Sequence, residues 1–254
     1  MVIVVLFALG LCIGSFLNVA IWRIPRRLSV VRPPSHCPSC EAFLRVRDLV
    51  PVVSWLLLRG RCRACAAPIS VRYPVVELTT AVLFAAVGVR FGASWALPAY
   101  LVFVAVAVVL AGIDLDTMTL PRRIIYGSGV AAVVLLAVAA VATGEPSRLT
   151  GAAIGAGGAL LFFLVLHLVA PGGMGFGDVR LAGLIGLHLG WLGLLEVPTG
   201  LFLGFGLGAV FGLGWLAYQR AGLRTHIPFG PFLAAGAVLT VLWGQPLVGL
   251  WYRG

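Results

Sequence analysis

Long apolar runs, separated by short polar or glycine-rich breaks, make up most of the chain. Their lengths approach the roughly 20 residues that an α-helix needs to cross a bilayer. The pattern predicts eight transmembrane helices, at about residues 2–22, 74–89, 95–113, 124–142, 151–170, 179–195, 199–218 and 230–249. The expected fold class is therefore all-α, a polytopic membrane helix bundle.

One long polar segment, residues 23–73, interrupts this pattern. It divides the chain into a first transmembrane helix at 1–22, a small loop domain at 23–73 and a membrane-embedded domain at 74–254. The first apolar run lacks a basic start and is too long for the apolar part of a signal peptide. We therefore expect a retained helix at 1–22 rather than a cleaved leader.

The composition indicates a membrane protein, and the distribution of charge predicts its orientation in the membrane. Hydrophobic residues make up 61% and charged residues only 10%, whereas soluble domains are about 25% charged. The net charge of +10 comes from arginine alone, and ten of the 18 arginines lie between Arg23 and Arg72. A cytoplasmic loop at 23–73 puts fifteen arginines inside and three outside, with both termini outside, as the positive-inside rule predicts. We therefore expect the lipid bilayer, and not nucleic acid, to be the partner of this basic chain.

Four of the five cysteines form two C-x2-C pairs, Cys37 with Cys40 and Cys62 with Cys65, separated by 21 residues. Paired thiolates at such spacing supply the tetrahedral ligand set of structural zinc. A loop with little apolar core also needs such a staple to fold. Two disulfides or a redox dithiol are the alternatives, and a reducing cytoplasm disfavours the disulfides. His36 is an alternative metal ligand, but the four cysteines already complete the tetrahedral set.

Carboxylates are rare, with eight acidic residues in the whole chain. Asp114 and Asp116 end the third apolar run, and Asp178 follows a glycine cluster before the sixth. Acids at membrane depth are costly and usually functional, and the predicted topology puts these three at one membrane face. We expect two of them to meet and perform acid/base chemistry. Asp114 and Asp116 point about 200° apart on a helix, so they do not face one partner together.

Glycines precede Asp178 at positions 175 and 177. Without side chains, they allow an extended substrate to lie close to the carboxylate. A simple turn between two spans accounts for them equally well, and both roles are compatible.

Together these features resemble the type IV prepilin peptidases, a family of membrane aspartic proteases. Asp114 stands seven residues before Pro121, as the first catalytic aspartate of the family does, and Gly175-Phe176-Gly177-Asp178 matches its G-x-G-D motif. Further matching segments are Gly14–Val19 with Arg23 and Pro25, Pro51–Trp55 between the cysteine pairs, Arg72–Pro74 with Glu77, and Pro228–Pro231. The sequence departs from the family pattern at Arg122 and Arg180, where Asp and Lys are common.

The resemblance implies an activity, substrates and cofactors. Asp114 and Asp178 would be the catalytic pair, cutting the basic leader of a prepilin or pseudopilin at the cytoplasmic boundary of the bacterial inner membrane. Many members then methylate the new N-terminus with S-adenosylmethionine, and the retained cysteine loop favours this second activity here. No G-x-G-x-x-G loop marks a methyl-donor site.

Two other functions explain part of the sequence. A transporter that relays protons or cations uses membrane aspartates, but it predicts acids near mid-bilayer and repeated halves. A presenilin-like intramembrane protease shares the G-x-G-D motif and leaves the cysteine loop unexplained. The sequence indicates neither the pilin processed nor the oligomeric state.

Overall fold

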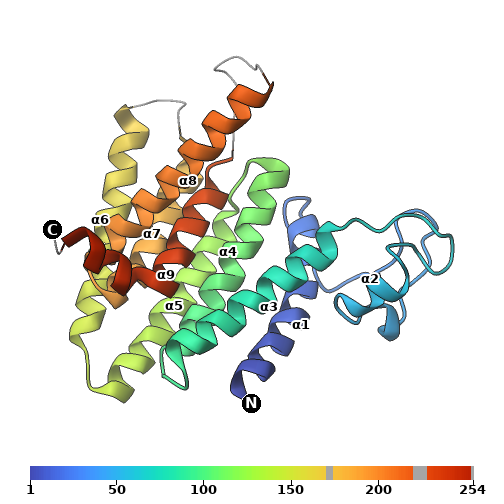
Figure 1. Ribbon diagram of the computed structural model, residues 1–254, viewed down its shortest axis with the longest axis horizontal. Helices are drawn as coiled ribbons and strands as arrows, with labels where there is room; N and C mark the ends of the chain where they lie inside the picture. Colours follow the sequence, from blue (N-terminus) through green and yellow to red (C-terminus); the bar gives the residue numbers. More distant parts are fainter. Residues whose placement is uncertain (170–173, 220–227, 253–254) are drawn as a thin grey trace. The chain divides into compact units, whose positions relative to one another are not determined.

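The computed structural model describes residues 1–169, 174–219 and 228–252, and within these it contains helices and no strand. Eight long helices occupy the eight predicted runs (Figure 1): α1 Val2–Arg23, α3 Arg72–Phe91, α4 Leu97–Thr117, α5 Arg122–Thr143, α6 Ser147–Val169, α7 Phe176–Leu192, α8 Glu196–Gln219 and α9 Gly230–Tyr252. Two short helices, η1 Val46–Asp48 and α2 Val53–Leu57, lie in the loop between α1 and α3. The all-α prediction is confirmed.

Six of the described helices are long and apolar enough to cross a membrane: α1, α3, α4, α5, α6 and the Glu196–Trp215 part of α8. The chain is thus a multi-pass membrane protein. Helix α7 has 17 residues, about 25 Å at 1.5 Å per residue. The apolar stretch of α9 within the described residues, Gly230–Gly244, is also shorter than a full span.

Residues Met1–Gly92 form one compact unit, in which α1 runs along α3 (Figure 1). Two glycines of α1 allow the close approach. A Cβ on Gly10 would lie 2.6 Å from Cα of Ala81, and a Cβ on Gly14 would lie 2.7 Å from Cα of Glu77. Small residues allow membrane helices to pack backbone to backbone in this way. The amide of Asn18 donates to the carbonyl of Tyr73 at 3.1 Å and ties the same pair of helices.

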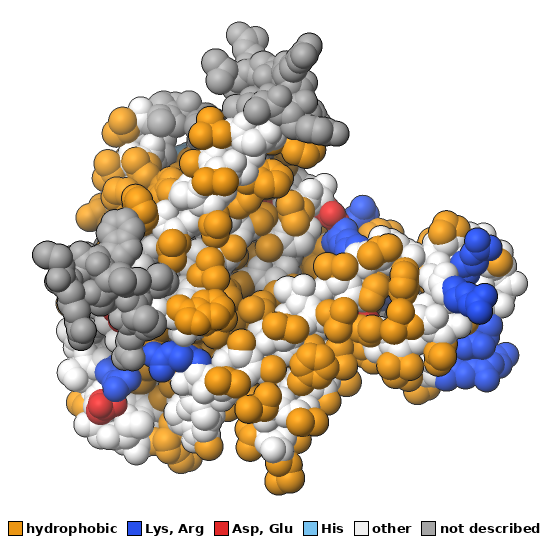
Figure 2. All heavy atoms as spheres, in the orientation of Figure 1, with side chains coloured by type: hydrophobic (Ala, Val, Ile, Leu, Met, Phe, Trp, Pro, Cys, Tyr) orange, Lys and Arg blue, Asp and Glu red, His pale blue; other side chains and the backbone are white. Residues whose placement is uncertain are grey.

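The loop between α1 and α3, residues 24–71, is called the cysteine loop below. Its arginines gather on the surface in Figure 2, whereas hydrophobic side chains spread over the helices. Trp55 of α2 donates from its indole to the carbonyl of Ile69 at 3.1 Å and covers Gly60, which has a left-handed φ of 67°. The backbone amide of Val52 donates to the Glu77 carboxylate of α3 at 2.7 Å. These contacts join the middle of the loop to its own end and to α3.

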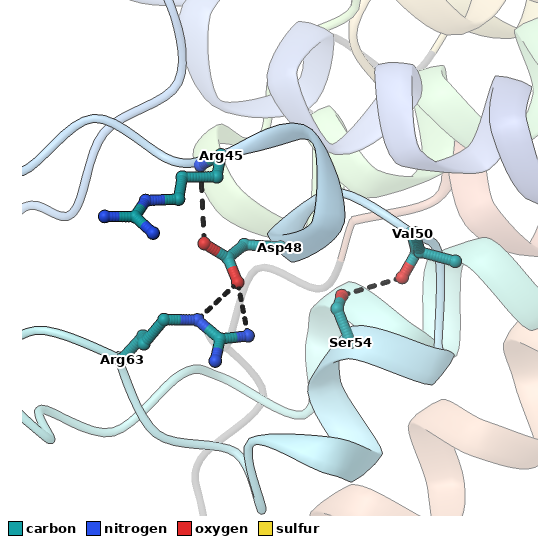
Figure 3. A network of polar contacts seen from close by, with 5 residues as sticks. All are labelled: Arg45, Asp48, Val50, Ser54 and Arg63. Carbon is teal, nitrogen blue, oxygen red and sulfur yellow. Dashed lines mark hydrogen bonds and ion pairs between the residues drawn. The ribbon is translucent and has the colours of Figure 1, made fainter.

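A small polar network orders the start of η1 (Figure 3). The Asp48 carboxylate accepts from the backbone amide of Arg45 at 3.3 Å and from the Arg63 guanidinium at 2.7 and 2.8 Å. The Ser54 hydroxyl donates to the carbonyl of Val50 at 2.7 Å. Arg63 thereby connects the two halves of the cysteine loop.

Residues Ala93–Gly254 form the second compact unit, which contains α4 to α9. Helices α6 and α7 lie side by side (Figure 1), and a Cβ on Gly151 would lie 2.6 Å from the carbonyl oxygen of Gly190. Helix α7 is well enclosed, with 12 of its 17 residues buried. The Tyr100 hydroxyl of α4 donates to the carbonyl of His188 at 2.7 Å, and the His188 ring stacks on Phe103 at 4.3 Å. Helix α7 is thereby fixed against α4.

Candidate active site and metal centre

Asp114 lies in the last turn of α4 and is 5% exposed. The helix ends at Thr117; the next residue, Met118, has a left-handed backbone with a φ of 50°, and its amide donates to the carbonyl of Asp114 at 2.8 Å. The carboxylate Oδ2 accepts a hydrogen bond from the backbone amide of Gly230 at 3.0 Å. Asp114 therefore joins the end of α4 to the beginning of α9.

Asp178 lies in the first turn of α7 and is 8% exposed. Its backbone amide donates to the carbonyl of Gly175, the N-cap residue, at 3.0 Å. Its carboxylate turns back toward the same residue, since a Cβ on Gly175 would lie 3.4 Å from Oδ2. An acid in this position compensates the unpaired amides and the positive end of α7.

The three helix ends that carry Asp114, Asp178 and Gly230 meet around Leu120. A Cβ on Gly177 would lie 2.9 Å from Cβ of Leu120, and a Cβ on Gly230 would lie 3.3 Å from its Cδ2. The structure thus brings together Asp114 and Asp178, 64 positions apart in sequence. The five residues Asp114, Leu120, Gly177, Asp178 and Gly230 are called the aspartate site below.

The two predicted glycines differ in their surroundings. Gly177 accommodates the side chain of Leu120, so a close approach explains its lack of a side chain. Gly175 is exposed and has an extended backbone, with φ −73° and ψ 145°, that any residue adopts. Conformational freedom is therefore not what Gly175 supplies.

Asp116 and the two arginines that depart from the family pattern lie outside this group. Asp116 is exposed in the last turn of α4, and Arg122 is exposed at the start of α5. Arg180 stacks on the ring of Phe176 at 4.5 Å and lies 5.9 Å from that of Tyr126.

Sequence reasoning missed the role of Gly230 and Leu120 in this site. Gly230 lies in the Pro228–Pro231 segment noted in the sequence, but its contact is made by a backbone amide. Leu120 precedes Pro121 and carries no polar group. The only signal for Gly230 was a glycine directly before a proline at the start of a predicted helix.

The four predicted cysteines of the loop also come together. Their sulfur atoms lie within 4.8 Å of one another, and the Sγ atoms of Cys37 and Cys65 are 3.8 Å apart. Two disulfides would need S–S distances of about 2.05 Å, and all four cysteines are free. His36 is exposed, with its Nδ1 3.2 Å from the carbonyl oxygen of Pro34.

The two cysteine pairs sit in matching turns. The amide of Cys37 bonds the carbonyl of Ala42 at 3.0 Å, and that of Cys62 bonds the carbonyl of Ala67 at 2.8 Å. Glu41 and Ala66 occupy equivalent left-handed positions, with φ of 57° and 58°. The two turns resemble those of metal-binding knuckles, and each presents two sulfurs to the same point.

The environment of the sulfurs fits a metal. Backbone amides of Ser39 and Cys40 lower the pKa of the Cys37 thiol to about 6, which favours the thiolate that binds zinc. The amide of Ala67 acts in the same direction on Cys65, but the neighbouring thiols outweigh it and raise the pKa of Cys65 to about 11. Four sulfurs this close in a tetrahedral donor set match structural zinc, and a cation would relieve their mutual repulsion.

Comparison with known families matches both parts of the chain. Residues 8–91 match the bacterial peptidase A24 N-terminal domain, and residues 101–213 match the type IV leader peptidase family. The first match contains the cysteine loop. The second contains Asp114 and Asp178.

Several curated proteins are similar over nearly the whole chain. A prepilin leader peptidase/N-methyltransferase of Bacillus subtilis (strain 168) is 35% identical over 249 residues, covering 98% of this chain and 97% of that protein. Proteins of the same name from Myxococcus xanthus (strain DK1622) and Aeromonas hydrophila are 42% and 35% identical, over 98% and 97% of this chain and 75% and 92% of their own lengths. No solved structure matches the chain.

Proposed function

Because the chain belongs to the type IV leader peptidase family, we propose that it is a membrane aspartic endopeptidase that removes the leader peptide of type IV prepilins or pseudopilins. One observation carries the proposal. Two buried carboxylates, Asp114 and Asp178, come from helix ends that are remote in sequence and that meet around Leu120.

The chemistry follows from two neighbouring acids. Close carboxylates do not both ionise cheaply, so one proton is shared between them. The ionised carboxylate takes a proton from water as the water attacks the scissile carbonyl, and the protonated one donates its proton to the carbonyl oxygen. The tetrahedral intermediate then collapses, and the leaving amine takes up a proton from the pair. No covalent intermediate with the protein is formed.

The predicted membrane topology supports a prepilin as the substrate. The arginine-rich cysteine loop faces the cytoplasm by the positive-inside rule, so the active site faces the cytoplasm of a bacterial inner membrane. A prepilin has a basic leader on that side followed by an apolar helix in the bilayer. Its cleavage site lies at the boundary, where a carboxylate pair at helix ends can reach it. Exposed Gly175 leaves room for an extended substrate beside Asp178.

N-methylation of the new N-terminus by S-adenosylmethionine is the second activity we propose. It is supported by the cysteine loop and by the name of the relatives, prepilin leader peptidase/N-methyltransferase. Cys37, Cys40, Cys62 and Cys65 would hold a zinc ion that staples the loop. The proposed division of labour is a first helix at 1–22, a zinc loop domain at 23–73 and a peptidase domain at 74–254.

Cleavage of a synthetic prepilin segment in detergent tests the assignment of the aspartates. We expect Asp114→Asn and Asp178→Asn each to lower kcat by about 10²–10⁴-fold, the usual contribution of a general acid or base. Asp116→Asn should retain cleavage, and Glu145→Gln, an exposed acid paired with Arg148, is the matched control. Normal cleavage by both asparagine variants would overturn the proposal in favour of a transporter.

A further inference from the structure

We propose that the backbone amide of Gly230 is a positioning group for peptide cleavage, which holds the Asp114 carboxylate in its working orientation. This inference rests on the proposed peptidase function. It assigns a role to the start of α9, which contributes no acidic or basic side chain to the aspartate site.

The contact is long-range and enclosed. Asp114 and Gly230 are 116 residues apart in sequence, and both are buried where the end of α4 meets the beginning of α9. The amide nitrogen of Gly230 lies 3.0 Å from Oδ2 of Asp114. Hydrogen bonds from an amide to a carboxylate are stronger than those between neutral groups.

This amide is set apart by its place in the helix. The first amides of a helix have no partner within it, and Pro231, the next residue, has no N–H to offer. The amides of Phe232 and Leu233 already bond the carbonyl of Phe229, at 3.1 and 3.2 Å. Gly230 is therefore the first donor of α9, and Asp114 caps it from another helix. The positive end of α9 favours the carboxylate anion.

A side chain at position 230 would require the Asp114 carboxylate to move. A Cβ on residue 230 would lie 2.7 Å from Oδ2 and 3.3 Å from Cγ of Asp114, and 3.3 Å from Cδ2 of Leu120. Neither the carboxylate nor the leucine can retreat without disturbing the aspartate site, because Leu120 also fills the space beside Gly177. A side chain at 230 would push the carboxylate away from the amide that holds it.

Fixing one carboxylate oxygen has a catalytic consequence. With Oδ2 of Asp114 engaged by the amide, the carboxylate does not rotate freely, and its other oxygen remains available to a water proton. Preorganised contacts of this kind lower the barrier because they need no rearrangement at the moment of reaction. The effect therefore falls on kcat rather than on substrate binding.

The test removes the N–H without adding a side chain. Replacing Gly230 by glycolic acid in the full-length chain, by nonsense suppression in cell-free synthesis, turns this amide into an ester. We expect kcat for a synthetic prepilin segment to fall about 10–100-fold with KM within about twofold. The acidic limb of the pH–rate profile should move to higher pH, because the lost donor favoured the ionised carboxylate.

A second variant probes the space instead of the donor. Gly230→Ala keeps the N–H and adds the Cβ, and we expect a loss of kcat at least as large. Gly206→Ala is the matched control, since a Cβ on Gly206 of α8 meets nothing within 4 Å. Equal losses in both alanine variants would show a general sensitivity to alanine and would count against the inference.

The outcomes separate this inference from the proposed function. If Asp114→Asn and Asp178→Asn are inactive but the ester has the kcat and pH profile of the native chain, the positioning role fails and the peptidase assignment stands. An ester that lowers only the melting temperature makes Gly230 a simple helix cap and also overturns the inference. Hydrogen exchange at Gly230 reports the contact without activity: Asp114→Ala should accelerate it, and Glu145→Ala should not.

Discussion

The cysteine loop and the aspartate site fix their polar groups in opposite ways. In the loop, four sulfurs from two local turns converge at the surface: Cys40 and Cys65 are exposed, Cys62 is half-buried and Cys37 is buried. In the aspartate site, two buried carboxylates are placed by the ends of long helices and by contacts with glycines. The loop has little apolar packing of its own, whereas the aspartate site is part of a packed helix bundle.

This difference indicates that the cysteine loop depends on a ligand for its structure, whereas the aspartate site does not. A loop without a core needs a metal to supply its folding energy. A site between packed helices depends on side-chain volume and backbone approach. Each part should therefore be breakable without the other, and the following experiments test that separation.

Removal of the proposed zinc should have the largest effect, and only on the loop. Zinc sites of this kind bind with apparent free energies of about 10–16 kcal/mol, so Cys37→Ser combined with Cys62→Ser should unfold residues 24–71. We expect zinc content, measured by mass spectrometry, to fall from one ion per chain to none and protease cuts to concentrate in the loop. The helices should keep their melting temperature. Cys12→Ser, which changes a cysteine of α1 outside the cluster, should alter neither readout.

Enlarging Gly177 should damage only the aspartate site. The added side chain would meet Leu120 at about 3 Å or less, and overpacking of this kind costs about 1–3 kcal/mol. We expect Gly177→Val to lower cleavage at least tenfold while zinc content stays at one. Adding Leu120→Ala should recover part of the activity. Gly157→Ala, in open space on α6, is the control; a loss of zinc in Gly177→Val would contradict the separation.

Loss of the Tyr100 hydroxyl should weaken the helix bundle without reaching the loop. Its hydrogen bond to the carbonyl of His188 is buried, and such bonds contribute about 1 kcal/mol. Tyr100→Phe should lower the melting temperature of the bundle by a few degrees and leave protease cutting of the loop unchanged. Tyr126→Phe changes an exposed tyrosine and should have no effect on either.

The Asp48–Arg63 pair should give the smallest effect, confined to the loop. The Arg63 guanidinium holds the pKa of Asp48 below its ordinary value of 3.8. The contribution of the Asp48–Arg63 pair to the stability of the loop is therefore complete above about pH 4, and it is lost as the pH falls through the lowered pKa of Asp48. With Arg63 45% exposed, we expect about 0.5 kcal/mol. The difference in loop protection between the native chain and Asp48→Asn should stay constant from pH 8 to 5; closure of that difference already at pH 6 would contradict this account.

The hydrophobic pattern located all eight long helices because unpaired backbone groups are too costly in lipid for such runs to be anything else. The ends were less certain. The span expected at 179–195 is α7, Phe176–Leu192, which begins earlier because Asp178 belongs to its first turn. A polar residue there breaks the apolar run without breaking the helix, so hydropathy places the start too late.

The functional residues also differ in how far the sequence could predict them. Cysteine spacing predicted the thiolate cluster because both knuckles are local in sequence. The resemblance singled out Asp114 and Asp178. The Gly-Pro pair at 230–231 marked only a helix start, and no feature of the sequence indicated the contact made by the Gly230 amide or by Leu120. Almost every residue has a backbone amide, so the sequence does not mark the one that acts as a donor here. Leu120 is likewise indistinguishable in the sequence from the many other leucines of a membrane protein.

The two knuckles of the cysteine loop are related by a fixed offset, since Cys62 follows Cys37 and Cys65 follows Cys40 by 25 positions. Each half presents two of the four sulfurs, so neither forms a tetrahedral site alone. Binding of the proposed zinc would therefore require both ends of the 21-residue connection to come together. Because a single ion would be shared by both halves, we expect the loop to fold in one step, with no stable half-folded form.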